Sequence, residues 1–145
     1  MRRIAYLAAT FAAVATLCVV PRSSQAQITE RIVAKIPHSF IVDNKTLPPG
    51  QYTFRIVQQT NQSTMRISDA DGRTVMEFLV RDSIDDHLPK HTELVFNRYG
   101  NKEFLAHIYQ TGTKLGAAVV DASREEAGLK NQGQSATTHT EEQEK

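Results

Sequence analysis

The amino-acid sequence predicts an all-β domain, and two observations carry this prediction. From Ile32 to Tyr109 the apolar residues recur with a period of two far more often than with a period of three or four. Turn-forming residues interrupt this pattern at short intervals, as they do in small β domains. We therefore expect a single small antiparallel β-sandwich or barrel with a short C-terminal helix and a disordered tail. The hydrophobic pattern leaves the choice between sandwich and barrel open.

The first expected strand has an apolar face and ends before a proline-rich turn. This face carries Ile36, His38, Phe40 and Val42. In the turn at 47–50, Pro49 presets φ and Gly50 accepts a positive φ. The pattern predicts a type II turn at this point.

Five further strands are expected before residue 110. They centre on 52–56, 65–67, 73–81, 94–96 and 103–109, with turns at 69–72 and 98–102. Apolar residues on both faces of the 73–81 segment indicate a buried or central strand. The segment Asp82 to His91 is acidic, contains Pro89 and lacks periodicity, so we expect an exposed loop.

The C-terminal part of the chain has a different character. Ser123 and Glu126 fit a capping box, in which the serine accepts from the Glu126 N–H and the glutamate reaches back, so a short helix to about residue 129 is expected. From 131 to 145 no aliphatic residue larger than alanine occurs, and burial cannot offset the entropy of ordering this segment. We expect a β-rich domain over 27–130 and a disordered tail over 131–145.

The first 26 residues are expected to form a cleavable secretory signal peptide. A basic start precedes an uncharged apolar run, which Pro21 breaks. Ser24 and Ala26 provide the small-x-small pattern that a signal peptidase accepts, which places the mature N-terminus at Gln27. The alternatives are a retained membrane anchor, which the cleavage site opposes, and lipid attachment at Cys18, which the bulky preceding leucine opposes.

Removal of this leader leaves fourteen basic and sixteen acidic residues, a net charge of −2, and no cysteine. This charge attracts neither nucleic acid nor an anionic membrane surface, so no nucleic-acid partner is expected. Without cysteine, the mature chain cannot form a disulfide, a thiolate metal site or a cysteine nucleophile. We expect an exported protein, periplasmic or extracellular, with no membrane span after the leader is removed.

One loop carries residues that could bind a metal ion. Asp85, His87 and His91 lie close together in the sequence, and carboxylate and imidazole are both acceptable ligands for zinc and similar divalent ions. Pro89 opposes a helix that would turn the two imidazoles to one side. The alternative is a solvated polar loop, and the sequence leaves the question open.

Arg98 and Tyr99 are candidates for a ligand contact, because guanidinium and phenol groups are common in recognition surfaces. In the alternative interpretation these residues only shape a hairpin at Gly100, with Arg98 paired across strands to Glu103 or Glu93. The need for glycine at the turn favours the alternative.

The sequence contains no recognisable catalytic motif. It has no Gly-x-Ser-x-Gly elbow, no His-Glu-x-x-His helix and no phosphate-cradling glycine loop, so we assign no catalytic residue and expect no cofactor. We expect an exported non-catalytic envelope module that binds a partner protein, a glycan or an apolar ligand. The alternatives are a structural or stress-abundant exported protein and, less favoured, a metal-dependent hydrolase that uses the 87–91 loop.

Three motifs give the chain a resemblance to a known group. They are an apolar-Pro-apolar-x-Phe-x-Val strand at 36–42, a Leu-Pro-x-Gly-x-Tyr turn at 47–52 and a Leu-x-Phe-x-Arg-Tyr-Gly-x-x-x-Phe-Leu hairpin at 94–105. In these the chain resembles small exported acidobacterial-type proteins of unknown function over about 34–129. His38 departs from the pattern, because such proteins tend to carry an aromatic or aliphatic residue there. The resemblance implies export and a β fold, and implies no activity.

Overall fold

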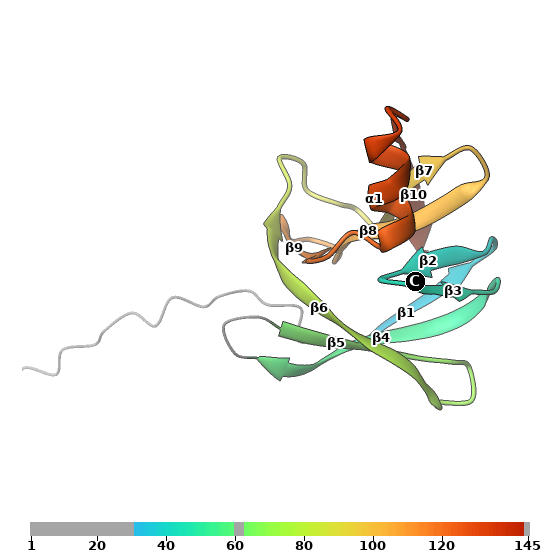
Figure 1. Cartoon of the computed structure of the whole chain (residues 1–145). Coiled ribbons are helices and arrows are strands. Elements are labelled where there is room, and N and C mark those ends of the chain that lie inside the picture. The colour runs from blue at the N-terminus through green and yellow to red at the C-terminus, as the bar shows by residue number, and fades with distance from the viewer. Residues whose placement is uncertain (1–30, 60–62, 144–145) are drawn as a thin grey trace, which may run out of the picture.

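A computed structural model describes residues 31–59 and 63–143 (Figure 1). The expected signal peptide at 1–26, with Cys18 and the cleavage site before Gln27, lies outside the described residues. Within the described ranges the chain forms ten strands and one helix, which confirms the expected all-β class with a short C-terminal helix. No helix in this part of the chain is long and apolar enough to cross a membrane.

The elements follow one another along the chain with short connections. In order they are β1 (Ile32–Ile36), β2 (Phe40–Val42), β3 (Lys45–Leu47), β4 (Gly50–Gln59), β5 (Ser63–Ser68), β6 (Thr74–Ile84), β7 (Thr92–Tyr99), β8 (Lys102–Tyr109), β9 (Leu115–Val119), α1 (Arg124–Asn131) and β10 (Thr137–Gln143).

The strands form one mixed sheet that is curled and open. Its order runs β1-β4-β5-β6-β9-β8, and β8 also pairs with β7, which in turn pairs with β10. Because β7 runs along the whole of β8, β9 and β2 share the opposite edge of β8. The β2–β8 pair is parallel, whereas the expected sheet was purely antiparallel. Neither a sandwich nor a closed barrel is confirmed.

The two outer strands of this curled sheet, β1 and β10, approach each other without pairing. They meet through one side chain: the Lys35 backbone N–H donates to Gln143 Oε1 at 2.7 Å, and Gln143 Nε2 donates to the Lys35 carbonyl at 3.4 Å. The C-terminal end of the described chain therefore lies beside β1 (Figure 1).

The expected first strand over 36–42 is divided in the structure. β1 ends at Ile36 and β2 begins at Phe40, so His38 lies in the link between them. Pro37 explains the break, because proline has no N–H to donate to a strand ladder. The type II turn is also wrong in detail, since Gly50 is not among the described glycines with positive φ and begins β4 instead.

The 82–91 loop is shorter than expected. β6 continues to Ile84 because Asp82 and its neighbours pair with β9, a strand that the sequence pattern did not reveal. The three middle residues of its sequence, Leu-Gly-Ala-Ala-Val, lack the large side chains by which the other strands were recognised. Gly100, by contrast, has the expected turn geometry, with φ of 61°.

The prediction of a disordered tail over 131–145 is wrong for β10 at 137–143. This strand pairs along its whole length with β7, from Thr137 opposite Arg98 to Gln143 opposite Thr92. It supplies backbone hydrogen bonds to an edge of β7 that would otherwise be open, and such an edge is a liability for any sheet. Hydrogen bonding, rather than burial of large aliphatic side chains, orders the tail.

Helix α1 begins at its expected cap, where the Ser123 side chain accepts from the Glu126 N–H at 3.0 Å. The second half of the capping box is wrong. The Glu126 carboxylate turns toward the sheet and accepts from Asn97 Nδ2 at 2.8 Å, which fastens the helix to β7.

The main hydrophobic core lies within the curl of the sheet. Alternation in the sequence predicts that seven large side chains lie on the apolar faces of the expected strands, and all seven are at most 5 % exposed: Phe40, Tyr52, Phe54, Phe78, Phe96, Phe104 and Ile108. Six of these belong to the main core. Phe104 instead joins a small second cluster with Ile41 and Tyr99, against which Leu129 of α1 packs.

Candidate functional site

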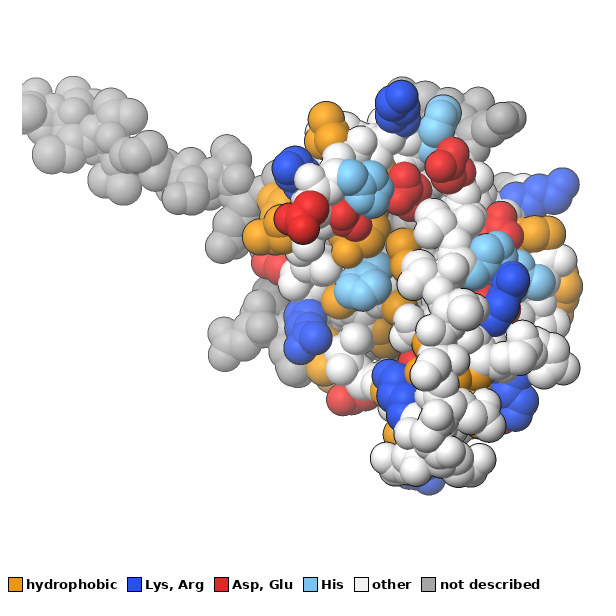
Figure 2. Space-filling model, turned by 90° about the horizontal axis from the view of Figure 1, so that it is seen from above, with side chains coloured by type: hydrophobic (Ala, Val, Ile, Leu, Met, Phe, Trp, Pro, Cys, Tyr) orange, Lys and Arg blue, Asp and Glu red, His pale blue; other side chains and the backbone are white. Residues whose placement is uncertain are grey.

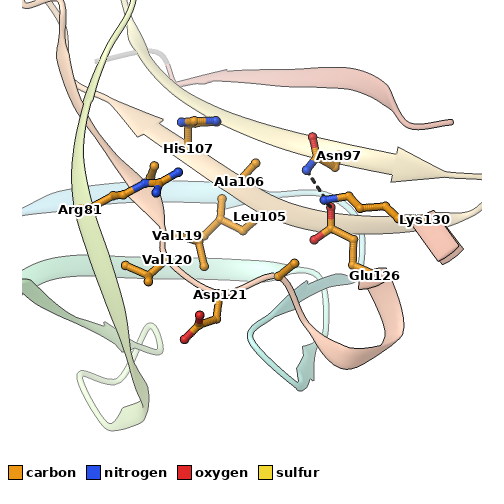
Figure 3. Close-up of a pocket in the computed structure, with 12 residues that line it drawn as sticks. Arg81, Asn97, Leu105, Ala106, His107, Val119, Val120, Asp121, Glu126 and Lys130 are labelled. Carbon is orange, nitrogen blue, oxygen red and sulfur yellow. Dashed lines mark hydrogen bonds and ion pairs between the residues drawn. The ribbon is translucent and has the colours of Figure 1, made fainter. Parts of the chain in front are cut away.

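A groove of about 210 Å³ lies between α1 and the strands β6, β7, β8 and β9 (Figure 3). Arg81 follows the buried core residue Val80, and Ala118 follows the core residue Ala117, so both point away from the main core. Leu105, which also lines the groove, belongs to the main core itself. The groove therefore lies at the margin of the main core.

The floor and the two ends of the groove differ in chemistry. Leu105, Ala106, Val119 and Val120 form an apolar middle, with Arg81 and His107 at one end and Asn97, Glu126 and Lys130 at the other (Figure 3). Ala106 sits where the β7–β8 register shifts, so β8 carries a bulge beside the groove. Bulges of this kind re-aim side chains and are common next to functional sites.

The end of the groove beneath α1 is a satisfied polar cluster. Glu126 is 4 % exposed, and its Oε1 accepts from Asn97 Nδ2 at 2.8 Å and from Lys130 Nζ at 3.1 Å. A buried carboxylate is tolerated when it is paired and hydrogen-bonded in this way. This end is therefore rigid, and it holds α1 at a fixed distance from the sheet.

The opposite end contains a neutral imidazole. Burial lowers the pKa of His107, the charge of Asp85 opposes this effect, and Arg81 adds a smaller lowering, so the uncharged ring is favoured at neutral pH. Its Nδ1 lies 3.3 Å from Ser83 Oγ, and that hydroxyl lies 3.2 Å from the Tyr109 hydroxyl. The His107 and Tyr109 rings stack with 9° between their planes.

Ser83 and His107 are within the reach that a serine nucleophile and its base require. Among the described residues, however, no carboxylate is hydrogen-bonded to the other nitrogen of His107 to orient the ring. Tyr109 also shares the serine hydroxyl. This arrangement can hold a bound polar group by hydrogen bonds.

The structure brings together two of the three candidate metal ligands in the 85–91 loop. His87 Nδ1 lies 2.5 Å from Asp85 Oδ1, and His87 Nε2 lies 3.1 Å from Glu93 Oε2. The Asp85 and Glu93 hydrogen bonds raise the pKa of His87. Because carboxylates occupy both ring nitrogens, the arrangement is that of an ion pair. His91 is exposed and does not join it.

Arg98 and Tyr99 shape the hairpin at Gly100, as the alternative to a ligand contact had it. Arg98 pairs across strands with Glu103, as the hairpin register requires. Tyr99 is only 5 % exposed and packs edge-on against Phe104, with ring centroids 5.7 Å apart. Burial raises the pKa of the Tyr99 hydroxyl. Tyr99 therefore belongs to the small core under α1 and offers no surface to a ligand.

A second cluster of possible metal ligands was not expected from the sequence. His38, His139 and Glu141 each place one ligand atom within 4.8 Å of the others. His139 and Glu141 belong to the tail that was expected to be disordered, and His38 was noted only for departing from the family pattern. Seen from above, histidine side chains lie beside carboxylates in more than one place on the surface (Figure 2).

The groove residues were also missed, although one signal for them exists. Arg81 and His107 occupy outward positions in strands whose other face is apolar, so their direction could be read from the alternation. The sequence could not show that Arg81 and His107 lie close together, because β9 and α1 complete the groove and β9 was not recognised. No protein-family model, curated protein or solved structure matches this chain.

Proposed function

We propose that the protein is an exported, non-catalytic envelope module that binds a partner protein through the groove between α1 and the sheet. The observation that carries the proposal is the groove itself: an apolar floor with hydrogen-bonding groups at both ends, held by four strands and a helix. Binding sites commonly combine an apolar lining with a few well-placed polar groups.

The size of the groove favours one side chain of a partner over a whole small molecule. Its volume of about 210 Å³ is below the roughly 300 to 1,000 Å³ of sites that enclose a small ligand. An aliphatic side chain on the Leu105 and Val119 floor would gain about 25 cal/mol for each Å² of apolar surface buried. Arg81 is exposed at the rim and suits a neighbouring carboxylate of the partner.

Two other ligand classes are less well supported. The main core is filled by side chains such as Phe40, Phe54 and Phe96, all with 0 % exposure, which leaves an apolar ligand little room among them. The residues that line the groove include no phenylalanine, tyrosine or tryptophan on which a sugar ring could stack. A glycan remains the second candidate, because Arg81, Asp121 and Asn97 could bond to hydroxyl groups.

The proposal can be tested by photocrosslinking in the producing cell. Benzoylphenylalanine would replace Ala122, an exposed residue at the groove, and in a matched control Ala70, an exposed residue of the β5–β6 hairpin. We expect a discrete protein adduct only from position 122, and its loss when Arg81→Ala is added. Equal adducts from positions 70 and 122 would contradict the proposal that a partner protein binds in the groove. Binding of a glycan that the substitution Ala122→Trp abolishes would contradict it as well.

Export is part of the proposal and rests on the residues of the leader. Ser24 and Ala26 supply the small side chains that a signal peptidase reads, and the kinship proposed with small exported acidobacterial-type proteins agrees. N-terminal sequencing of protein recovered from the periplasm or the medium should begin at Gln27. Recovery of a chain that starts at Met1 from the membrane fraction would contradict export by cleavage.

For the architecture, we propose a barrel rather than a sandwich. The support is the approach of the outer strands at Lys35 and Gln143, which continues the curl of the sheet toward closure. Spin labels at Val33 and Glu142, which are both exposed, should give one short, narrow distance distribution. A broad distribution would mean that the two edges separate in solution.

A further inference from the structure

His38, His139 and Glu141 meet at the seam between the first and last strands. On β10 the half-buried positions 139, 141 and 143 alternate with exposed ones, so His139 and Glu141 point to the same side. His38 faces them from the link between β1 and β2. His38 Nδ1 lies 3.5 Å from Glu141 Oε1, and His139 Nε2 lies 3.2 Å from the same oxygen.

These distances are those of ligands around one metal ion. Ligands bound to zinc at about 2.0 to 2.1 Å in a tetrahedron lie about 3.3 to 3.4 Å from one another. Two of the three separations, 3.5 and 3.2 Å, are within a few tenths of an ångström of this spacing, and all three ligand atoms lie within 4.8 Å of one another. Two imidazoles and one carboxylate form a common donor set for zinc and related transition ions, with a fourth position left open.

His139 Nε2 faces the cluster, and its Nδ1 has two neighbours: Glu103 Oε1 at 3.2 Å and an Arg98 guanidinium nitrogen at 2.9 Å. Arginine can only donate, so Nδ1 accepts in the Arg98 contact and donates only when it is bonded to Glu103. Metal-binding histidines usually donate their second N–H to a carboxylate, which fixes the tautomer and the orientation of the ring. Arg98 is bonded to the same Glu103 and holds it in place across the hairpin.

The polar atoms around this cluster are not all satisfied. Two buried side-chain polar atoms in the described part of the chain lack a hydrogen-bond partner: His38 Nε2 and Glu103 Oε2. Buried polar atoms in native proteins are nearly always satisfied, so each calls for a partner such as a water. His38 Nε2 is the ring nitrogen opposite to Nδ1, which faces Glu141, so an ion bound at Nδ1 leaves Nε2 free to donate to such a water.

Packing holds the two rings in place and leaves them within reach of solvent. Phe96 meets the His38 ring edge-on with centroids 5.1 Å apart, and the His38 and His139 centroids are also 5.1 Å apart. The side chains of His38, His139 and Glu141 are 23 to 25 % exposed. An ion can enter from solvent and still be partly shielded from it.

We propose that His38, His139 and Glu141 bind one divalent transition-metal ion of the zinc class, with water or a group of a partner in the fourth position. The ion fastens the last strand to the β1–β2 link. This site is separate from the groove, and it stands or fails independently of the proposed partner. The competing explanation is a hydrogen-bonded cluster in which His139 bridges Glu103 and Glu141, and that cluster needs no metal.

The test measures zinc binding to the full chain, purified without a histidine tag and stripped with a chelator. Competition with a chromophoric zinc chelator gives stoichiometry and affinity, and cobalt added in place of zinc reports the geometry through its visible absorption. We expect one equivalent of zinc and a tetrahedral cobalt spectrum. Glu141→Gln and His139→Ala should each weaken zinc binding at least tenfold.

Two control variants match these changes. Glu142→Gln alters the exposed neighbour on the same strand, and His87→Ala removes the histidine of the ion pair in the 85–91 loop. Both should leave the affinity for zinc unchanged. Glu141→Gln nearly preserves side-chain shape, and its melting curve without metal shows that it folds.

A second readout is thermal stability, because a ligand that binds only the folded state raises the melting temperature. Zinc should raise the melting temperature of the parent and of Glu142→Gln, and leave that of Glu141→Gln unchanged. The proposal is overturned if the stripped chain takes up no stoichiometric zinc. Uptake that survives both Glu141→Gln and His139→Ala, or that His87→Ala abolishes, would overturn it equally.

Discussion

Gly116 shows how closely two strands approach beside the groove. It lies opposite Tyr109 in the β8–β9 pair, and a Cβ atom at this position would come within 2.3 Å of Tyr109 Cδ1 and 2.6 Å of the Ile108 carbonyl oxygen. The carbonyl belongs to the backbone and cannot move without disturbing the sheet. Gly116 is therefore required by space rather than by its φ.

We predict opposite effects for two glycine-to-alanine substitutions. Gly116→Ala should lower the free energy of unfolding by about 1 to 3 kcal/mol, because an added group in a filled site forces its neighbours apart. Gly128→Ala should raise it by about 0.5 to 1 kcal/mol, because Gly128 is inside α1 and an added Cβ meets nothing within 4 Å. Urea denaturation measures both. Equal stability of the two variants would show that β8 and β9 pack less closely.

The pKa of His87 is expected to lie above the ordinary histidine value of 6.5, and the pKa of His107 is expected to lie below it. Hydrogen bonds to Asp85 and Glu93 favour the charged form of His87, and burial disfavours the charged form of His107. His87 thus stabilises the fold fully below pH 6.5, and this contribution is lost as the pH rises through its raised folded pKa. For His107, stability falls when the pH drops below its unfolded pKa, because unfolding releases a ring that can then take a proton.

Asp85 limits the His87 contribution on the acid side. A backbone hydrogen bond from His87 lowers the pKa of Asp85 from 3.8, so the pair weakens as the pH falls through that lowered value. NMR titration of the imidazole carbons should give a pKa above 6.5 for His87 and below 6.5 for His107. The substitution Asp85→Asn should move the pKa of His87 back toward 6.5. The pKa of His107 should stay below 6.5. Equal pKa values for His87 and His107 in the parent would contradict the environments described for the two rings.

Among the elements, β10 depends most on tertiary contacts. Its sequence, Thr-Thr-His-Thr-Glu-Glu-Gln, buries no large aliphatic side chain, and its partner strand β7 supplies the order. Strands with alternating apolar faces, such as β4 and β7, could be predicted because burial leaves a periodic trace in the sequence. β9 and β10 left no such trace, and the sites they complete were missed for the same reason. The capping serine of α1 was found because its signal is local.

We predict that a chain ending at Lys130 is less stable than the parent, contrary to what the sequence alone indicated. The truncation removes the ladder between β10 and β7 and uncovers the Phe96 ring, which His139 contacts at a centroid distance of 6.1 Å. The melting temperature should fall, and a chain ending at Gln143 should melt like the parent. Equal melting of the chain ending at Lys130 would mean that β10 detaches readily from the sheet.

At the scale of the whole molecule, one continuous core joins strands from both ends of the sheet order. Residues of β1, β4, β5, β6, β7 and β8 all contribute to it, and the small cluster of Ile41, Tyr99 and Phe104 under α1 lies beside it. Domains with a single core usually unfold in one cooperative step. Phe96 is central to this unit, because its ring packs against both Phe40 and His38.

We predict that Phe96→Ala lowers the free energy of unfolding by about 3 to 5 kcal/mol, the usual cost of removing a fully buried phenyl ring. Fluorescence and circular dichroism should still report the same denaturation midpoint, since the core is shared. Separate midpoints for the two probes would show that the β1–β4–β5 region unfolds apart from the rest.

Because β10 pairs with β7, the sheet can be completed only after the C-terminal part of the chain has been synthesised. A chain that emerges N-terminus first, from a ribosome or through a translocation pore, exposes β7 long before β10 arrives. Until residue 143 has emerged, the sheet lacks its final strand and Lys35 lacks its partner at the seam. A chain that ends before β10 keeps the edge of β7 unpaired permanently. Emergence of β10 is thus a condition for completing the described sheet.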